Sequence, residues 1–168
     1  MSVDVTVWRI GVDTPDYEAH DLSGKGAEKT GGRWNRKGTP MVYTSVSRSL
    51  ACLETVVHLG GSDPLPLNRY LVQINIPIAL WNSRLKLDPA HHLGWDAEPA
   101  GKVSVDWGTA WIQGKTTLLA EVPSVIVLEE HNILINPDHP DAVRLTAIKV
   151  RKWTYDLRIK RVRQAPRR

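Results

Sequence analysis

Short runs of alternating apolar and polar residues, separated by stretches rich in glycine and proline, limit most strongly what this chain can fold into. Val3–Ile10 alternates in this way, the period-two pattern of a strand with one buried face. Arg69–Ile76 shows the same pattern and is stopped by Pro77. Further β-prone runs are predicted at Met41–Ser45, Ser124–Leu128, Ile133–Ile135 and Val143–Val150.

Two segments have helical patterns. Ser47 is a typical N-cap residue before the segment Leu50–Leu59, and Gly60-Gly61 is expected to end that helix. Ser104–Ala120 is predicted to form the second helix. Two main helices beside five to seven strands predict an α+β domain.

Two stretches are expected to be irregular. The segment Gly11–Gly32 is rich in Gly, Asp, Ser and Thr, and Asp88–Gly101 is rich in Pro, Gly and His. Loops of this length in compact domains commonly carry function.

Size and charge indicate one domain with a basic end. The chain has 168 residues, 42% of them hydrophobic and 24% charged, which is typical of one globular domain. Its net charge is +4, from 22 basic and 18 acidic residues. Six basic and no acidic residues follow Asp156, so the preceding domain carries 16 basic against 18 acidic residues. We expect a domain over residues 1–157 and a poorly ordered basic tail over residues 158–168.

The compartment is predicted from what the sequence lacks. A single cysteine, Cys52, cannot form an internal disulfide, and no apolar run approaches the roughly 18 residues of a membrane span. These features favour a cytoplasmic protein without a membrane segment.

Glu54 is the most informative single residue. With Leu50, Leu53 and Val57 expected as the inward stripe of its helix, Glu54 falls about 40° from Leu50. A charge beside a buried face is costly unless it is paired, hydrogen-bonded or used. Either the carboxylate reaches solvent at the stripe edge, or it serves a cleft.

Arg33 and Tyr43 are weaker candidates. Arg33 follows Gly31-Gly32, where the backbone has unusual freedom, and its guanidinium suits phosphate or carboxylate groups. Alternation places Tyr43 on the face opposite its strand neighbours, where it lines either the core or the cleft of Glu54.

Other polar residues carry less information. His91-His92 has no further ligands at zinc spacing, so no metal site is predicted. Asn136 is the first residue of Asn136–Pro140, a segment whose composition is typical of a turn. A role for Asn136 in the cleft is the second interpretation.

Several segments together resemble the RES domain. They are Gly32-Arg33-Trp34-Asn35, Met41–Ser45, Leu50–Glu54, Val122–Val127 and Asn132–Pro140, in order over roughly residues 5 to 158. The family takes its name from an Arg, a Glu and a Ser, which fall on Arg33, Glu54 and Ser124.

The resemblance implies a fold, an activity and partners. RES domains are similar to ADP-ribosyltransferase toxins, with a split β core around an NAD cleft. They are toxins that degrade NAD at its nicotinamide–ribose bond, paired with Xre-type helix-turn-helix antitoxins. By this resemblance, no cofactor is needed, NAD is the substrate, and inorganic phosphate is left open as a co-substrate. An antitoxin would cover the active site, DNA would be contacted only through it, and a homodimer is left open.

The same resemblance assigns roles to residues. Glu54 would stabilise the positive charge that develops at the ribose, and Arg33 would hold the pyrophosphate. Tyr43 would stack on the nicotinamide, and Ser124 would support Glu54 or the ligand. Asn136 would be a further NAD contact.

Two alternatives stay open at this point. A protein or nucleic-acid ADP-ribosyltransferase would use the same residue types and pass the sugar to a macromolecule. A nucleic-acid-binding or RNase-like toxin would rely on the basic tail, although the near-neutral domain argues against it.

Overall fold

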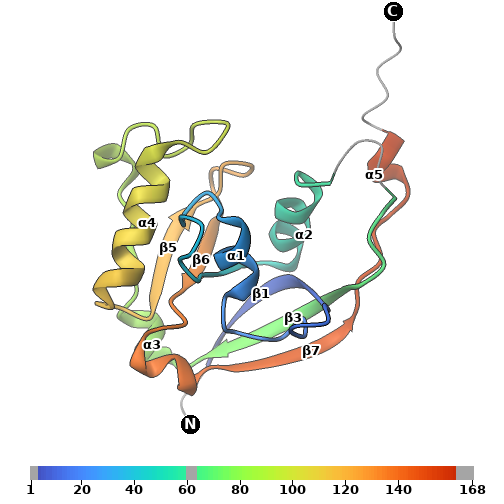
Figure 1. Cartoon of the computed structure of the whole chain (residues 1–168), viewed down its shortest axis with the longest axis horizontal. Helices are drawn as coiled ribbons and strands as arrows, with labels where there is room; N and C mark the ends of the chain where they lie inside the picture. Colours follow the sequence, from blue (N-terminus) through green and yellow to red (C-terminus); the bar gives the residue numbers. More distant parts are fainter. Residues whose placement is uncertain (1–3, 60–63, 162–168) are drawn as a thin grey trace, which may run out of the picture.

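The computed structural model describes residues 4–59 and 64–161 (Figure 1). Seven strands form one sheet in the order β4-β5-β6-β2-β1-β3-β7. The strands are β1 (Val5–Val12), β2 (Val42–Ser45), β3 (Arg69–Ile76), β4 (Leu85–Lys86), β5 (Leu119–Pro123), β6 (His131–Ile135) and β7 (Thr146–Lys152). The α-helices are α1 (Lys25–Thr30), α2 (Arg48–Val56), α3 (Ile78–Asn82), α4 (Lys102–Gly114) and α5 (Arg158–Arg161), with 3-10 turns at Pro89–His91 and Pro140–Arg144.

The sheet is divided between β1 and β2. These strands share a single aligned pair, Trp8 with Ser45, whereas β1 pairs with β3 along its whole length and β2 pairs with β6. One half is therefore β1-β3-β7 and the other is β2-β6-β5-β4. The predictions of an α+β domain and of a split β core are confirmed.

Each half-sheet has its own helix (Figure 1). In the half with β5 and β6, Trp111 and Ile112 of α4 pack into a cluster with Leu134. In the other half, Ala51 of α2 packs against Trp8 and Leu71. The Ser47 side chain accepts a hydrogen bond from Leu50 N at 3.1 Å, which confirms the predicted cap of α2.

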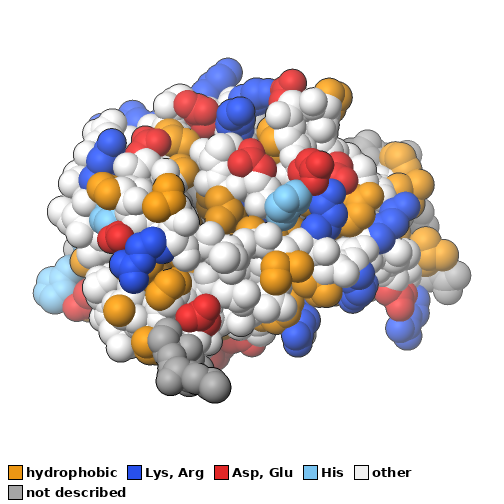
Figure 2. Space-filling model, turned by 90° about the horizontal axis from the view of Figure 1, so that it is seen from below, with side chains coloured by type: hydrophobic (Ala, Val, Ile, Leu, Met, Phe, Trp, Pro, Cys, Tyr) orange, Lys and Arg blue, Asp and Glu red, His pale blue; other side chains and the backbone are white. Residues whose placement is uncertain are grey.

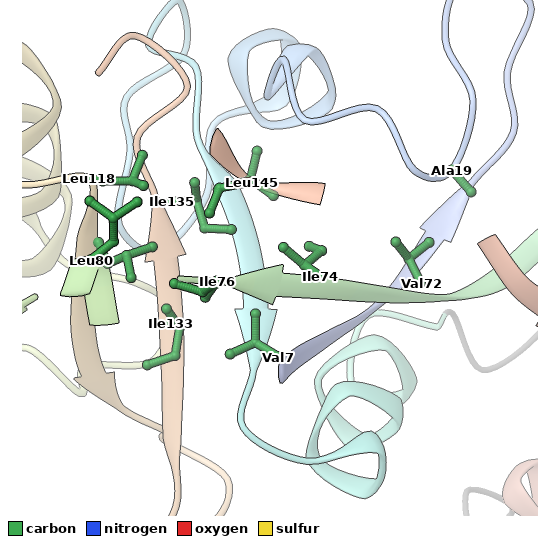
Figure 3. Close-up of a cluster of buried hydrophobic side chains, with 12 residues drawn as sticks. Val7, Ala19, Val72, Ile74, Ile76, Leu80, Leu118, Ile133, Ile135 and Leu145 are labelled. Atoms are coloured by element: carbon green, nitrogen blue, oxygen red, sulfur yellow. The ribbon is translucent and has the colours of Figure 1, made fainter. Parts of the chain in front are cut away.

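A third cluster joins the two halves (Figure 3). Val7, Val72 and Ile74 come from β1 and β3, while Ile133 and Ile135 come from β6, and all are buried. This shared core holds the half-sheets together although they share only one strand pair.

Three sequence predictions about elements are wrong. The segment Gly11–Gly32 is not wholly a loop, because β1 runs to Val12 and α1 lies inside it. The second helix ends at Gly114, since Lys115 adopts a left-handed conformation with φ of 48°. The run Ser124–Leu128 forms a turn, and the strand is β5 before it.

The remaining element predictions differ only at their ends. The predicted strand Val143–Val150 appears as β7, which begins three residues later and ends two residues later. The helix α2 ends at Val56, before the expected end at Gly60-Gly61, and those two glycines lie outside the described residues. Of the predicted tail, Arg158–Arg161 form α5, and residues 162–168 lie outside the described residues.

Surface charges are mixed on the face seen from below. Figure 2 shows Lys and Arg side chains interspersed with Asp and Glu rather than gathered in one positive patch. Within the described ranges, no helix has the length and apolar character that crossing a membrane requires.

Candidate active site

A cavity of about 1110 Å³ opens where β1 and β2 diverge. Residues of both half-sheets line it, from β1 and β2. Further lining residues come from the helices α1 and α2, from the loop after α1, and from the segments 96–100 and 123–126. This volume lies just above the range of about 300–1,000 Å³ that is usual for ligand pockets, which suits a dinucleotide-sized molecule. Glu54, Arg33 and Tyr43 all line it, so the structure brings these three predicted residues together.

The carboxylate of Glu54 is held by two side chains from the other half-sheet. Ser124 Oγ donates to Glu54 Oε1 at 2.9 Å, and Asn132 Nδ2 donates to the same oxygen at 2.6 Å. Neither donor reaches Oε2, so the second oxygen is left for the cavity. Two side-chain donors on one oxygen fix the orientation of the carboxylate.

Ser124 contacts Glu54 and is not among the residues that line the cavity. It is fully buried, and its Oγ also accepts hydrogen bonds from Ile126 N at 3.1 Å and Val127 N at 3.2 Å. The hydroxyl therefore fixes the turn after β5 and the Glu54 carboxylate together. The hydrogen bond to Glu54 is present, while a role in the reaction and a direct contact with a ligand stay predictions.

Asn132 was missed by sequence reasoning as a site residue. It pairs with Ser45 across β2 and β6, and Ser45 Oγ donates to Asn132 Oδ1 at 2.7 Å. This bond orients the amide so that its nitrogen points to Glu54. The signal available was a polar residue at the start of the apolar run Ile133–Ile135.

Tyr43 presents its ring to the cavity, while its hydroxyl is already used. The hydroxyl donates to Asn35 Oδ1 at 2.7 Å and accepts from Trp34 N at 2.9 Å. Burial raises the pKa of Tyr43, so the phenol stays neutral. A Cβ on Gly32 would lie 2.7 Å from this hydroxyl, which explains the glycine there.

Arg33 lies in the cavity wall with its side chain 16% exposed. Its Nη1 donates to the carbonyls of Trp95 at 3.3 Å and Ala97 at 2.8 Å, and its Nη2 to Glu98 Oε2 at 2.7 Å. Arg33 thus ties the irregular segment Asp88–Gly101 to the glycine-rich loop.

Arg9 is a second arginine in the cavity, and sequence reasoning did not identify it as a site residue. It stands on β1 beside the divergence from β2, and its Nη1 donates to Asp21 O at 3.2 Å. Burial lowers the pKa of its guanidinium, and the charge of Asp21 partly offsets this. An arginine inside an otherwise β-type apolar run was the available signal.

Asn136 is not part of the cavity. It is fully buried, its Nδ2 donates to Ile112 O at 3.0 Å, and its Oδ1 accepts from Asp138 N at 3.0 Å. It joins the end of β6 to α4, so the structure does not place it with the other NAD-binding candidates. The turn interpretation of this residue is the correct one.

The expected inward stripe of α2 is also wrong. Leu50 is buried, but Leu53 is 40% and Val57 is 45% exposed. Leu50 and Ala51 are the buried residues of α2, whereas Glu54 and Thr55 line the cavity. Glu54 consequently faces the cavity and not a helix–sheet interface.

The site is suited to electrostatic chemistry at a glycosidic carbon. A fixed carboxylate beside an apolar ring stabilises positive charge that develops on a bound sugar. Within the described residues, no group of three His, Cys, Asp or Glu side chains is arranged to hold a metal ion.

Comparisons with known proteins agree with this geometry. The RES domain model matches residues 6–158. A protein of Sphingobium sp. strain YBL2 named "Prs ADP-ribosylating toxin" is 58% identical over 153 residues, covering 90% of this chain and 94% of that protein. Proteins named "Toxin Res" from Yersinia enterocolitica and Pseudomonas putida are 37% and 34% identical, covering 86% and 91% of this chain and 93% and 98% of their own lengths. The chain therefore belongs to the RES-domain family of toxins.

Proposed function

We propose that this toxin cleaves the nicotinamide–ribose bond of NAD in the cytoplasm. The observation that carries the proposal is the carboxylate of Glu54, fixed through one oxygen by Ser124 and Asn132 at a cavity large enough for a dinucleotide. The bond breaks through an oxocarbenium-like state, which a carboxylate beside the ribose stabilises. Nicotinamide leaves as a neutral molecule from a cationic pyridinium, so no general acid is needed.

The other residues position the substrate. The ring of Tyr43 provides a flat surface for the nicotinamide. Arg33, in the loop after α1, and Arg9, on β1, supply positive charge for the pyrophosphate. Glu54 also serves to hold a ribose hydroxyl and orient the attacking group, which is water or phosphate.

A second candidate is transfer of ADP-ribose to a protein. The name of the Sphingobium relative, which is 58% identical, favours it. The cleavage step is the same in both candidates, and only the acceptor differs. The mixed charge on the lower face gives no support to the nucleic-acid-binding alternative (Figure 2).

One experiment separates these activities. Purified protein is incubated with NAD labelled in its adenosine half, with and without phosphate, and in parallel with a bacterial lysate. Free ADP-ribose or its phosphorylated form identifies hydrolysis or phosphorolysis, whereas label on a protein band identifies a transferase. Intact NAD in every arm, from a sample with a normal melting curve, contradicts the proposal.

A toxin with this activity must be inhibited in the cell that makes it. An Xre-type helix-turn-helix antitoxin that covers the cavity would inhibit it. Leu53 is exposed on α2, one residue before Glu54, and offers an apolar contact beside the cavity. We expect Leu53→Asp to weaken antitoxin binding while NAD cleavage persists. Full inhibition of this variant at wild-type antitoxin concentrations would contradict that placement.

A further inference from the structure

The guanidinium of Arg33 is already paired with a carboxylate of the same chain, that of Glu98. Its Nη2 donates to Glu98 Oε2 at 2.7 Å, and both residues line the cavity. The two carbonyls of the same segment, Trp95 O and Ala97 O, occupy Nη1. Both terminal nitrogens of the arginine are therefore engaged by residues 95–98.

The two partners of this ion pair are unequally buried. The Arg33 side chain is 16% exposed, whereas that of Glu98 is 80% exposed. The carboxylate is already largely hydrated and can leave the guanidinium at little cost, while the guanidinium stays in the cavity wall. The backbone carbonyls continue to hold Arg33 in place when Glu98 leaves.

We infer that Glu98 is a built-in competitor for the anion site at Arg33, and that a substrate pyrophosphate must displace it to use Nη2. A carboxylate and a phosphate oxygen make the same kind of bond to a guanidinium, so they exclude one another at one nitrogen. Displacing Glu98 therefore lowers the binding affinity of the substrate. The identification of NAD as the source of the pyrophosphate rests on the proposed function.

The size of the effect follows from the exposure of Glu98. Exposed ion pairs are weak, so removing the carboxylate should tighten anion binding by about two- to five-fold and not by orders of magnitude. The turnover number should stay unchanged, because Glu98 acts only on the free enzyme. The KM for NAD should fall by a similar factor.

The test measures binding of inorganic pyrophosphate to the full chain by calorimetry. Glu98→Ala removes the competitor, and Glu98→Gln removes only its charge. Asp106→Asn is the matched control, because it removes one carboxylate from a different arginine pair, Arg36–Asp106, and neither of those residues lines the cavity. Arg33→Gln tests whether the anion binds at this arginine.

The inference predicts tighter pyrophosphate binding in both Glu98 variants, no change in Asp106→Asn, and loss of binding in Arg33→Gln. Equal or weaker binding in Glu98→Ala would overturn it, and so would an equal gain in Asp106→Asn. A gain for inorganic phosphate but not for pyrophosphate would also overturn it. Because pyrophosphate binding needs no catalysis, a chain that fails to cleave NAD leaves this result readable.

Discussion

Asn132 Nδ2 donates to Glu54 Oε1 at 2.6 Å across 78 positions of sequence, and so joins β6 of one half-sheet to the helix that packs on the other. Together with the bond from Ser124, it fixes one carboxylate oxygen and leaves the second for the cavity. The candidate catalytic group is thus positioned by the very division of the sheet that creates the cavity.

The first prediction concerns Glu54. Glu54→Gln keeps the size of the side chain but removes the charge that stabilises the oxocarbenium-like state. We expect cleavage of NAD to fall by about 10²-fold or more, the scale found when one stabilising group is removed. Nicotinamide release by chromatography measures it, with exposed Glu129→Gln as the control. Unchanged release in a folded Glu54→Gln sample would remove Glu54 from the mechanism.

The second prediction concerns Ser124. Ser124→Ala removes the bond to Glu54 and an acceptor for two buried backbone N–H groups. We expect a loss of about 1–3 kcal/mol in the free energy of unfolding, and a lower kcat at nearly constant KM.

A control separates stability from positioning in that variant. Thr117→Val removes a hydroxyl that accepts from Trp111 Nε1 and donates to Leu119 O, and Thr117 does not line the cavity. It should lose stability and keep kcat. If both variants lose kcat equally, Ser124 has no specific positioning role.

The third prediction compares two glycines of α4. A Cβ on Gly108 would lie 1.9 Å from the carbonyl oxygen of Trp34, whereas the nearest atom to a Cβ on Gly114 is at 3.8 Å. Gly108→Ala should cost about 1–3 kcal/mol or more, because α4 must move away from the loop that follows Arg33. Gly114→Ala should be neutral or stabilising by up to about 1 kcal/mol. Equal melting temperatures for the two variants would contradict this close approach.

The fourth prediction concerns pH. The pKa of Asp13 is lowered, first by the hydrogen bond from Ala19 N at 2.7 Å and then by Lys149. A carboxyl group with a lower pKa in the folded state stabilises the protein above its unfolded pKa of about 3.9, and this contribution is lost as pH falls through the folded pKa. The stability difference between wild type and Asp13→Asn should therefore be constant near neutrality and shrink toward pH 3. Urea unfolding across this range measures it, and a difference independent of pH would be the contrary result.

Local signals in the sequence were sufficient for much of the fold. The Ser47 cap, the alternation in β3 before Pro77, and the β-branched run of β6 each depend on neighbouring residues, and each was predicted correctly. The end of α4 was not, because Lys115 adopts a left-handed conformation that the sequence pattern favours only for glycine or asparagine.

The candidate site was predictable only in part. Glu54, Arg33 and Tyr43 reach one cavity as expected, but their partners come from distant segments. The bond from Asn132 depends on strand pairing, and the burial of Asn136 depends on α4 packing beside β6. Neither relation has a signature in the spacing of residues, so neither could be found before the strand order was known.

The single strand pair between Trp8 and Ser45 has a consequence for how this cavity tolerates change. Beyond that pair, β1 and β2 have no further aligned residues, and residues of both strands line the cavity. The width of the cavity therefore depends on how the two half-sheets pack through the core that they share. A substitution in that core can change the cavity even where the substituted residue does not line it.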